Sequence, residues 1–176
     1  VWAADRGTTS RIRAVPAQPG GQERIVTATW LRPGERIVDL RLSRSGAQAA
    51  MLVDDGQRTT LRVSGVVRGS KGVPNALTEP ILLPSSGSED SVEWAGDTNL
   101  LVSAYAAKPD ERVVPRIVSV DGTVRELNPL GGLRGISAGD DGAYYAETEE
   151  FVFLLVGSSW RAQELDRGVR DLSFPD

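Results

Sequence analysis

The sequence predicts an all-β fold, and within that class a β-propeller region of about four blades that is a fragment of a larger propeller. Three observations predict it. Apolar and polar residues alternate in many short runs, turn dipeptides containing glycine separate those runs, and a weak repeat recurs at the length of a propeller blade. The 176 residues, with 19 Gly and 10 Pro, suffice for one turn-rich domain with a sizeable core.

Strand periodicity is clearest at residues 38–43, where Val38, Leu40 and Leu42 share one face and polar residues share the other. The same period recurs at 59–63. Runs rich in β-branched or aromatic residues predict further strands at 81–83, 99–105, 113–120 and 151–156. Dipeptides that supply positive φ to tight hairpins stand between the runs: Ser45-Gly46, Asp55-Gly56, Asp121-Gly122 and Asp141-Gly142. Residues 160–169 lack an apolar stripe and are expected to be extended.

The repeat consists of four segments, and Gly46, Gly96 and Gly139 mark corresponding points at spacings of 50 and 43 residues. A propeller blade has roughly 40–50 residues. A polar insertion at 69–75 explains the longer spacing by lengthening one hairpin. The predicted blades are approximately 1–31, 37–84, 90–128 and 133–175, and the first lacks its beginning. Periodicity alone leaves a β-sandwich open as the alternative.

Within this scheme each complete blade has four strands. In the second blade we expect them at 37–43, 47–54, 58–68 and 76–84. In the third blade we expect them at 90–95, 99–107, 113–121 and 123–128. The small residues Ala47, Ala49 and Ala50 fit positions where neighbouring blades crowd together, and the four tryptophans are expected to fill the space between sheets rather than to stack on sugars.

Composition excludes several classes of function. The net charge of −4 and the pI near 5.0 argue against nucleic acid as a partner. The absence of cysteine excludes disulfides, thiolate zinc sites and thiol catalysis within the chain. The longest apolar run, 151–156, is far shorter than the roughly 20 residues of a membrane-spanning helix, and no signal segment opens the chain.

Motifs for catalysis, cofactors and metals are weak. Residues 135–139 fit G-x-S-x-G, but a nucleophile elbow needs a base, and the chain contains no histidine. We therefore expect Ser137 to lie on an inner strand. Residues 65–72 resemble a phosphate loop, yet Ser70 stands at the second glycine position. The acidic groups at 54–55, 140–141 and 147–150 lack the spacing of a calcium loop. We predict no catalytic residue, no cofactor and no metal.

Six stretches spread from one end of the chain to the other form a pattern together: VWAAD (1–5), LRLSRSG (40–46), VSGVVR (63–68), GVPNALT (72–78), SVEW (91–94) and GVRDLSFP (168–175). In this order and spacing they resemble the C-terminal propeller domain of the LpqB family of actinobacterial lipoproteins. The resemblance implies a lipid-bearing cysteine and a GerMN-type region upstream of this chain. It also implies that the family's propeller begins before Val1, so that one or more blades are missing here.

The resemblance implies a function as well. It places the full-length protein at the extracytoplasmic face of the cell membrane, held there only by the upstream lipid anchor. It implies an accessory or regulatory role beside the sensor kinase MtrB of the MtrA/MtrB two-component system, which affects cell-wall homeostasis and division. The family supplies no catalytic residues to carry over.

A contact surface for the partner follows if the blades run from inner to outer strand, because alternate connections then share one face. These connections are 32–36, 54–58, 84–90 and 108–112. We expect this charged face to contact a sensor-kinase extracellular domain. The candidate partner-binding residues are Arg32, Arg36, Asp54, Asp55, Arg58, Lys108, Asp110, Glu111 and Arg112. The alternatives are a hydrolase of cell-wall glycans or esters and a structural spacer.

Overall fold

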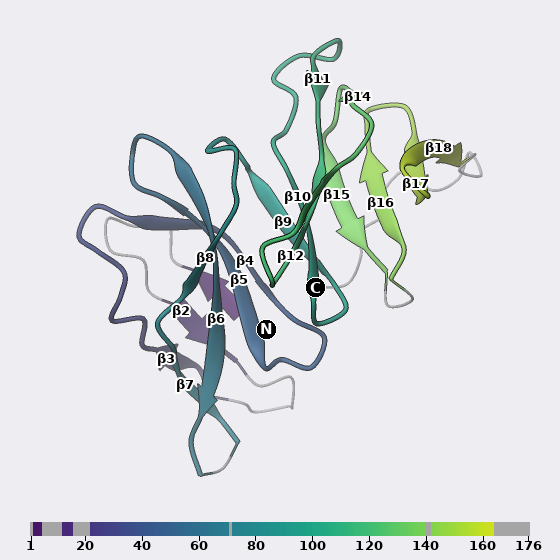
Figure 1. Ribbon diagram of the computed structural model, residues 1–176. Helices are drawn as coiled ribbons and strands as arrows, with labels where there is room; N and C mark the ends of the chain where they lie inside the picture. Colours follow the sequence, from purple (N-terminus) through teal and green to yellow (C-terminus); the bar gives the residue numbers. More distant parts are fainter. Residues whose placement is uncertain (1, 5–11, 16–21, 71, 140–141, 164–176) are drawn as a thin grey trace.

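The computed structural model describes residues 2–4, 12–15, 22–70, 72–139 and 142–163, and within them the regular elements are all strands. The strands form four antiparallel sheets that follow one another along the chain, with one additional two-stranded ribbon. Figure 1 shows these sheets side by side, from the purple and blue N-terminal strands to the green and yellow C-terminal ones. The described part of the chain holds no helix with the length and apolar character needed to cross a membrane.

Each sheet comes from a continuous stretch of sequence. The first sheet holds β1 (Trp2–Ala4), β2 (Ile12–Ala14) and β3 (Arg24–Val26). The second holds β4 (Arg36–Leu42), β5 (Gln48–Asp54), β6 (Thr59–Arg68), β7 (Pro74–Leu77) and β8 (Ile81–Leu83). The third holds β9 (Ser91–Ala95), β10 (Asn99–Ser103), β12 (Arg116–Ser119) and β13 (Val124–Glu126). The fourth holds β15 (Gly135–Ala138), β16 (Tyr144–Glu147), β17 (Val152–Val156) and β18 (Ser159–Gln163), and the ribbon pairs β11 (Arg112–Val113) with β14 (Leu130–Gly131).

Each pair of successive sheets encloses its own hydrophobic core. The first core joins the first and second sheets, the second core joins the second and third, and the third core joins the third and fourth. Representative members, in that order, are Ile12 and Met51, Leu61 and Leu100, and Leu101 and Ile136. A sandwich has one core between two sheets, whereas cores in series are the arrangement of propeller blades. The structure therefore confirms the propeller.

Strand β5 shows why the sequence folds in this way. Ala49, Met51 and Val53 face the first core, while Ala50 and Leu52 face the second. All five side chains are 0% exposed. Because successive side chains of a strand point to opposite faces, a strand covered on both faces needs a continuous apolar run. Full burial of each large side chain contributes about 1.5–3 kcal/mol.

Strand β10 repeats this arrangement in the next sheet. Leu100 and Val102 face the second core, and Leu101 between them faces the third. None of the three has exposed surface. The second strand of each of these sheets is thus the point at which two neighbouring sheets are held.

The third and fourth sheets are simple meanders in chain order, but the second sheet departs from the predicted four strands. Its expected last strand at 76–84 is two short strands, because Pro80 lacks the N–H that would continue the ladder. β8 pairs with the first half of β6, and β7 pairs with the second half. Of the predicted insertion at 69–75, residues 69, 70, 72 and 73 lie between β6 and β7, residues 74 and 75 begin β7, and residue 71 lies outside the described residues.

A second departure concerns the expected strand at 113–121. Strand β12 covers only residues 116–119, and Val113 belongs instead to β11, which pairs with β14. Pro115 separates the two strands. The predicted turn glycines do adopt positive φ, which is 65° at Gly46, 87° at Gly56, 91° at Gly122 and 80° at Gly142.

Polar side chains join the first strands of neighbouring sheets. The Asp39 carboxylate, next to a register shift in β4, accepts a hydrogen bond of 3.0 Å from the backbone N–H of Val92 in β9. Arg41 Nε donates to Glu93 at 2.7 Å. The buried Trp94 donates from its indole N–H to the carbonyl of Arg41 at 2.9 Å. These contacts connect β4 and β9 without a backbone ladder.

The packing role predicted for the tryptophans holds at two further positions. Trp160 packs against the third core and donates to the carbonyl of Asn128 at 3.0 Å. Trp30 packs against the first core. Of the small residues expected between blades, Ala49 and Ala50 are buried there, but Ala47 is exposed because it lies in the β4–β5 turn.

The cores in series generate a stability prediction. Leu100→Ala should lower the free energy of unfolding by about 2–5 kcal/mol, because it leaves a cavity between the second and third sheets. Leu82→Ala removes the same atoms from a side chain that is 68% exposed, and should change the free energy by less than about 0.5 kcal/mol. Denaturant unfolding followed by tryptophan fluorescence measures both, and equal effects would contradict this packing.

Candidate interaction face

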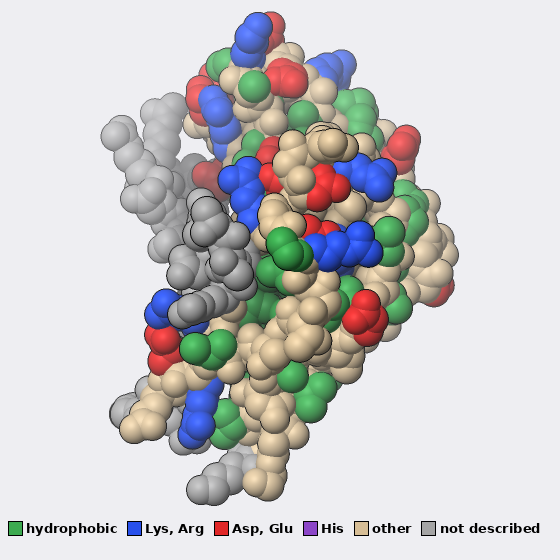
Figure 2. All heavy atoms as spheres, turned by 90° about the vertical axis from the view of Figure 1, so that its left-hand side faces the viewer, with side chains coloured by type: hydrophobic (Ala, Val, Ile, Leu, Met, Phe, Trp, Pro, Cys, Tyr) green, Lys and Arg blue, Asp and Glu red, His purple; other side chains and the backbone are tan. Residues whose placement is uncertain are grey.

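Alternate connections of the antiparallel sheets lie at one end of the molecule, called the loop face below. It carries residues 32–36, 54–58, 84–90, 104–115, 127–134 and 148–151. In Figure 1, β11 and β14 mark its upper end. All nine residues predicted to contact a partner belong to the loop face, and their contact with a partner stays a prediction. On the side drawn in Figure 2, basic and acidic side chains lie intermingled over the upper half.

A first group of predicted residues forms the turn after β5. Arg36 Nη2 lies 2.6 Å from the Asp54 carboxylate. Asp54 also accepts the N–H of Gly56 at 2.8 Å, and this bond, followed by the one from Arg36, lowers the pKa of Asp54. Asp55 accepts the N–H groups of the next turn residues, Gln57 and Arg58, which lower its pKa in the same way. Both carboxylates therefore hold the turn.

Beneath this group lies a buried ion pair that the sequence did not indicate. Glu35 is buried and accepts two hydrogen bonds from Arg62, of 2.6 and 3.1 Å. It also accepts the backbone N–H of Arg32 at 2.9 Å. The Arg62 guanidinium lies 5.6 Å from the ring centroid of Trp30, within cation–π range. This cluster fixes the start of β4 and with it the position of Arg32.

Charge on Glu35 is favoured by its partners. The hydrogen bonds from Arg62 lower the pKa of Glu35, and the N–H of Arg32 adds to them against an opposing effect of burial. A carboxyl group with a lowered pKa in the folded state stabilises the fold in its ionised form.

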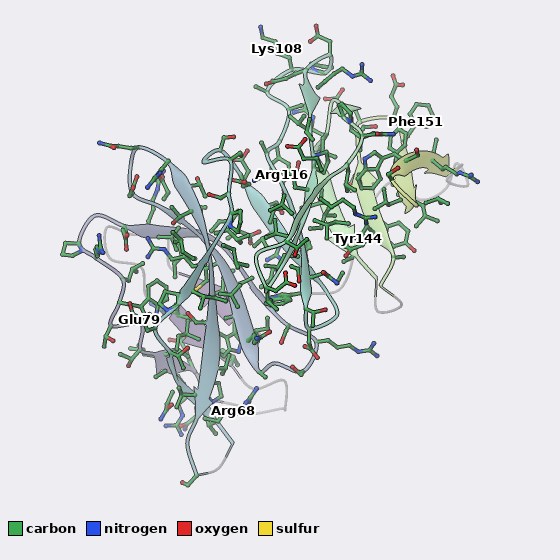
Figure 3. All side chains as sticks on the ribbon, in the orientation of Figure 1. Arg68, Glu79, Lys108, Arg116, Tyr144 and Phe151 are labelled. Atoms are coloured by element: carbon green, nitrogen blue, oxygen red, sulfur yellow. The ribbon has the colours of Figure 1, made fainter. Side chains whose placement is uncertain are left out.

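A second group occupies the connection between β10 and β12. The Glu111 carboxylate accepts the N–H of Ala107 at 2.7 Å, and the Glu111 carbonyl accepts the N–H of Gly132 at 2.9 Å. Gly132 has a φ of 66°, and a Cβ there would lie 2.7 Å from the carbonyl oxygen of Pro109. Glu111 thus holds the loop, while Lys108, Asp110 and Arg112 are exposed. Lys108 stands at the top of the molecule in Figure 3.

A hollow of about 460 Å³ lies beside the second group, which contributes Glu111 to its lining. Its lining comes from the connection before β9, the end of β10, the connection to β12 and the end of β13. The residues are Ser86, Ser88, Glu89, Asp90, Ser103, Ala104, Tyr105, Glu111, Val113, Val114, Arg116 and Glu126. Figure 3 places Arg116 well below Lys108, near the centre of the molecule.

A second buried ion pair forms the floor of this hollow. Glu89 is 2% exposed, pairs with Arg116, and accepts the N–H groups of Ser86 at 2.5 Å and Gly87 at 3.1 Å. Burial lowers the pKa of Arg116, and the charge of Glu126 opposes that effect. The Gly87 carbonyl in turn accepts the N–H of Thr59 at 2.9 Å, which connects the hollow to the turn after β5.

Of the lining residues, only Glu111 is among the candidate contacts named from the sequence, although Ser86, Ser88, Glu89 and Asp90 lie in the connection 84–90 that the sequence assigned to the charged face. Glu89 lies near the end of a Ser/Gly-rich connection, and an acidic residue close to the start of a strand is a weak local signal. Arg116 opens β12 and carries no signal of its own. Only the pairing of β9, β10 and β12 brings the two together.

The remaining motifs fall on ordinary strand structure. Residues 135–138 form β15, and Ser137 pairs with Tyr145 of β16, so the strand–turn–helix of a nucleophile elbow is not formed there. Residues 65–68 continue β6 into a hairpin. Among the described residues, no three carboxylates are grouped so that they hold a metal ion. Asp140 and Asp141 lie outside those residues.

Residues 1–175 match the family described as the lipoprotein LpqB beta-propeller domain. No protein with a curated description matches the sequence.

Several solved structures share the fold at low sequence identity. One, from a study of two prolyl endopeptidases, is 19% identical with a TM-score of 0.54, over 91% of this chain and 26% of that chain. Prolyl oligopeptidase B from Galerina marginata bound to a 35mer substrate is 18% identical with a TM-score of 0.54, over 93% and 29%. A putative 6-phosphogluconolactonase from Bacteroides fragilis is 10% identical with a TM-score of 0.50, over 88% and 54%. This chain spans less than a third of each peptidase, and the likeness shows the fold alone.

The buried pair of Glu35 and Arg62 generates a pH prediction. The stability contributed by Glu35 is fully present above the ordinary glutamate pKa of about 4.3 and is lost as pH falls through its lowered pKa in the folded state. Near neutral pH, the free energy of unfolding of the Glu35→Gln variant should be about 1–3 kcal/mol lower than that of the unsubstituted chain. The difference should shrink below about pH 4.

Urea unfolding across this pH range measures the difference. Glu149→Gln is the matched control, because Glu149 pairs with Arg134 at 2.6 Å on the exposed surface, where such pairs contribute about 0–1 kcal/mol. A difference for Glu35→Gln that stays constant from neutral to acidic pH would contradict the assignment.

Proposed function

Because this chain belongs to the lipoprotein LpqB β-propeller domain family, we propose that it is the extracytoplasmic interaction module of a lipid-anchored lipoprotein. Its partner is a protein, and its mechanism is binding. The anchor lies in the upstream part of the full-length protein, at the outer face of the cell membrane. The match over residues 1–175 supports this proposal, since it assigns nearly the whole chain to a lipoprotein family.

The proposed partner is the extracellular domain of the sensor kinase MtrB in the MtrA/MtrB system. The module acts there as an accessory or regulatory component, with effects on cell-wall homeostasis and division. The resemblance of the sequence to its family motivates this choice of partner. The structure adds a physical reason for binding at the loop face, which combines exposed charge with firmly held turns.

The hydrogen bonding within the turns of the loop face is the observation that carries the proposal. Asp54, Asp55 and Glu111 each hold their own turn by accepting backbone N–H groups. The charged tips at Arg58 and Lys108 are exposed on these turns. A surface ordered before it meets its partner loses less conformational entropy on binding. Exposed charges on such a surface raise the rate of encounter and favour partners of complementary charge.

Binding rather than catalysis is part of the proposal. Ser137 lies in the ladder of β15, and the sequence contains no histidine to serve as its base. The peptidases and the lactonase that share the fold do so at 10–19% identity, which carries no activity over to this chain.

Charge reversal at two exposed tips tests the proposed contact. Lys108→Glu combined with Arg112→Glu should weaken capture of the MtrB extracellular domain by at least about tenfold, because two attractive charges become repulsive at the interface. Arg125→Glu combined with Arg161→Glu makes the same change in net charge on the outermost strands β13 and β18. Surface plasmon resonance at two salt concentrations measures both variants. Equal affinity for both would contradict the loop face as the contact.

A replacement experiment separates recognition from spacing. In the anchored full-length protein, residues 1–176 are exchanged for an unrelated β-domain of similar length. If this domain recognises the kinase, co-purification of the kinase is lost although the anchor and the spacing remain. Retained co-purification would show that the domain serves as a spacer.

A further inference from the structure

The hollow on the loop face carries an excess of negative charge. Its lining contains four carboxylates, at Glu89, Asp90, Glu111 and Glu126, and one guanidinium, at Arg116. Glu89 forms the buried ion pair with Arg116. The other three carboxylates belong to exposed residues that also line the hollow. The charge of the hollow therefore favours a cation as its occupant.

The side chains beside these carboxylates suit a cation on an apolar stem. Tyr105 is 39% exposed and Val114 is 43% exposed, and both line the hollow together with Val113. Burial raises the pKa of Tyr105, so its ring is neutral near physiological pH. An aromatic face attracts arginine and lysine head groups, and apolar walls cover the methylene groups that precede them.

The size of the hollow fits a single inserted group. Its volume of about 460 Å³ lies in the lower half of the roughly 300–1,000 Å³ range of ligand sites. Its lining from the 84–90 and 104–115 connections places it on the loop face, where a protein partner is proposed to dock.

We propose that the hollow receives an arginine or lysine side chain of the protein partner, with its head group between Asp90, Glu111 and Glu126 and its stem against Tyr105 and the two valines. This inference rests on the proposed function as a protein-binding module and names the chemistry of the contact. An anionic group is a poor occupant, because Arg116 lies against Glu89 and faces Glu126 across the β12–β13 ladder.

Hydrogen bonds to the backbone hold the residues that line the hollow, which favours binding of a partner side chain. Glu89 is held by two backbone N–H groups in addition to Arg116. Asp90 accepts the N–H of Tyr105 at 3.0 Å, which sets the position of the aromatic wall relative to one of the carboxylates. The walls are therefore in place before an occupant arrives, and little ordering accompanies its entry.

The first test uses a small probe on the 176-residue chain. N-acetyl-arginine amide is titrated into the isotopically labelled chain, and N-acetyl-citrulline amide serves as the neutral isostere. We expect saturable amide shifts at Glu89, Tyr105 and Glu111, with affinity for the arginine probe about tenfold higher than for citrulline, equivalent to roughly 1.4 kcal/mol. Equal affinities, shifts confined to other parts of the chain, or no shifts would overturn the proposal.

Matched variants test the carboxylates directly. Glu111→Gln combined with Glu126→Gln should lower the affinity for the arginine probe by about tenfold, because two of the three exposed charges are lost. Glutamine keeps an acceptor for the N–H of Ala107, so the loop is expected to stay folded. Glu149→Gln combined with Glu150→Gln removes the same charge from the loop face outside the hollow and should leave the affinity unchanged. Thermal unfolding checks both pairs, and equal loss of affinity in both would overturn the proposal.

Capture of the kinase domain separates this inference from the proposed function. If the arginine probe binds and the kinase domain does not, the hollow is a cation site and the choice of kinase is wrong. If the kinase domain binds while the probe does not, the module function holds and the inference about the hollow is wrong. If both bind, Glu111→Gln combined with Glu126→Gln should also weaken binding of the kinase domain. Undiminished capture of that domain would overturn the assignment of the hollow to this partner.

Discussion

Burial of both faces of the second strand in a sheet is the constraint on which the rest of this structure depends. Strands β5 and β10 each present alternate side chains to two different cores, so each holds a sheet on either side. Sheets bound in this way must follow one another in series, because one sheet supplies a wall to two cores. The ends of the strands take no part in these cores, which leaves the connecting loops available for other contacts.

The apolar cores hold the sheets together, and polar contacts fix the positions of strands and loops within that arrangement. Asp39, Arg41 and Trp94 join β4 to β9 where backbone pairing between sheets is absent. The buried pairs of Glu35 with Arg62 and of Glu89 with Arg116 lie under the loop face. A buried ion pair gains little net stability, since desolvation offsets the attraction, but removing one partner is costly. We infer that the main effect of these pairs is to fix the loops in one arrangement.

Functional and structural charges are therefore mixed on the loop face. Asp54, Asp55 and Glu111 were predicted as contacts for a partner, and each accepts backbone N–H groups of its own turn. Exposed carboxylate oxygens on a held turn still contribute to the field that a partner meets. The proposed mechanism thus requires no conformational change. The sheets hold the turns in place, and the turns present charged side chains and a hollow of defined shape to the partner.

The sequence by itself determined the all-β fold class, the positions of most strands and the turns between them. These features depend on neighbours a few residues apart: the alternation at 38–43, the continuous apolar run at 49–53, and glycines such as Gly46 and Gly56 that accept positive φ. Even the local departures have local causes, since Pro80 divides the expected last strand of the second sheet and Pro115 ends β11. The positive φ of the turn glycines was correctly predicted for the same reason.

Only the tertiary structure decided the pairing of Glu35 with Arg62 and of Glu89 with Arg116. It also decided the hollow on the loop face, because Glu89 and Arg116 are part of its lining. In each pair the partners stand 27 residues apart on different connections and strands. Their meeting depends on the register of several ladders and on the packing of one sheet against the next. The periodicity of the sequence indicates which face of the sheet a side chain lies on, but it does not indicate which distant residue that side chain contacts.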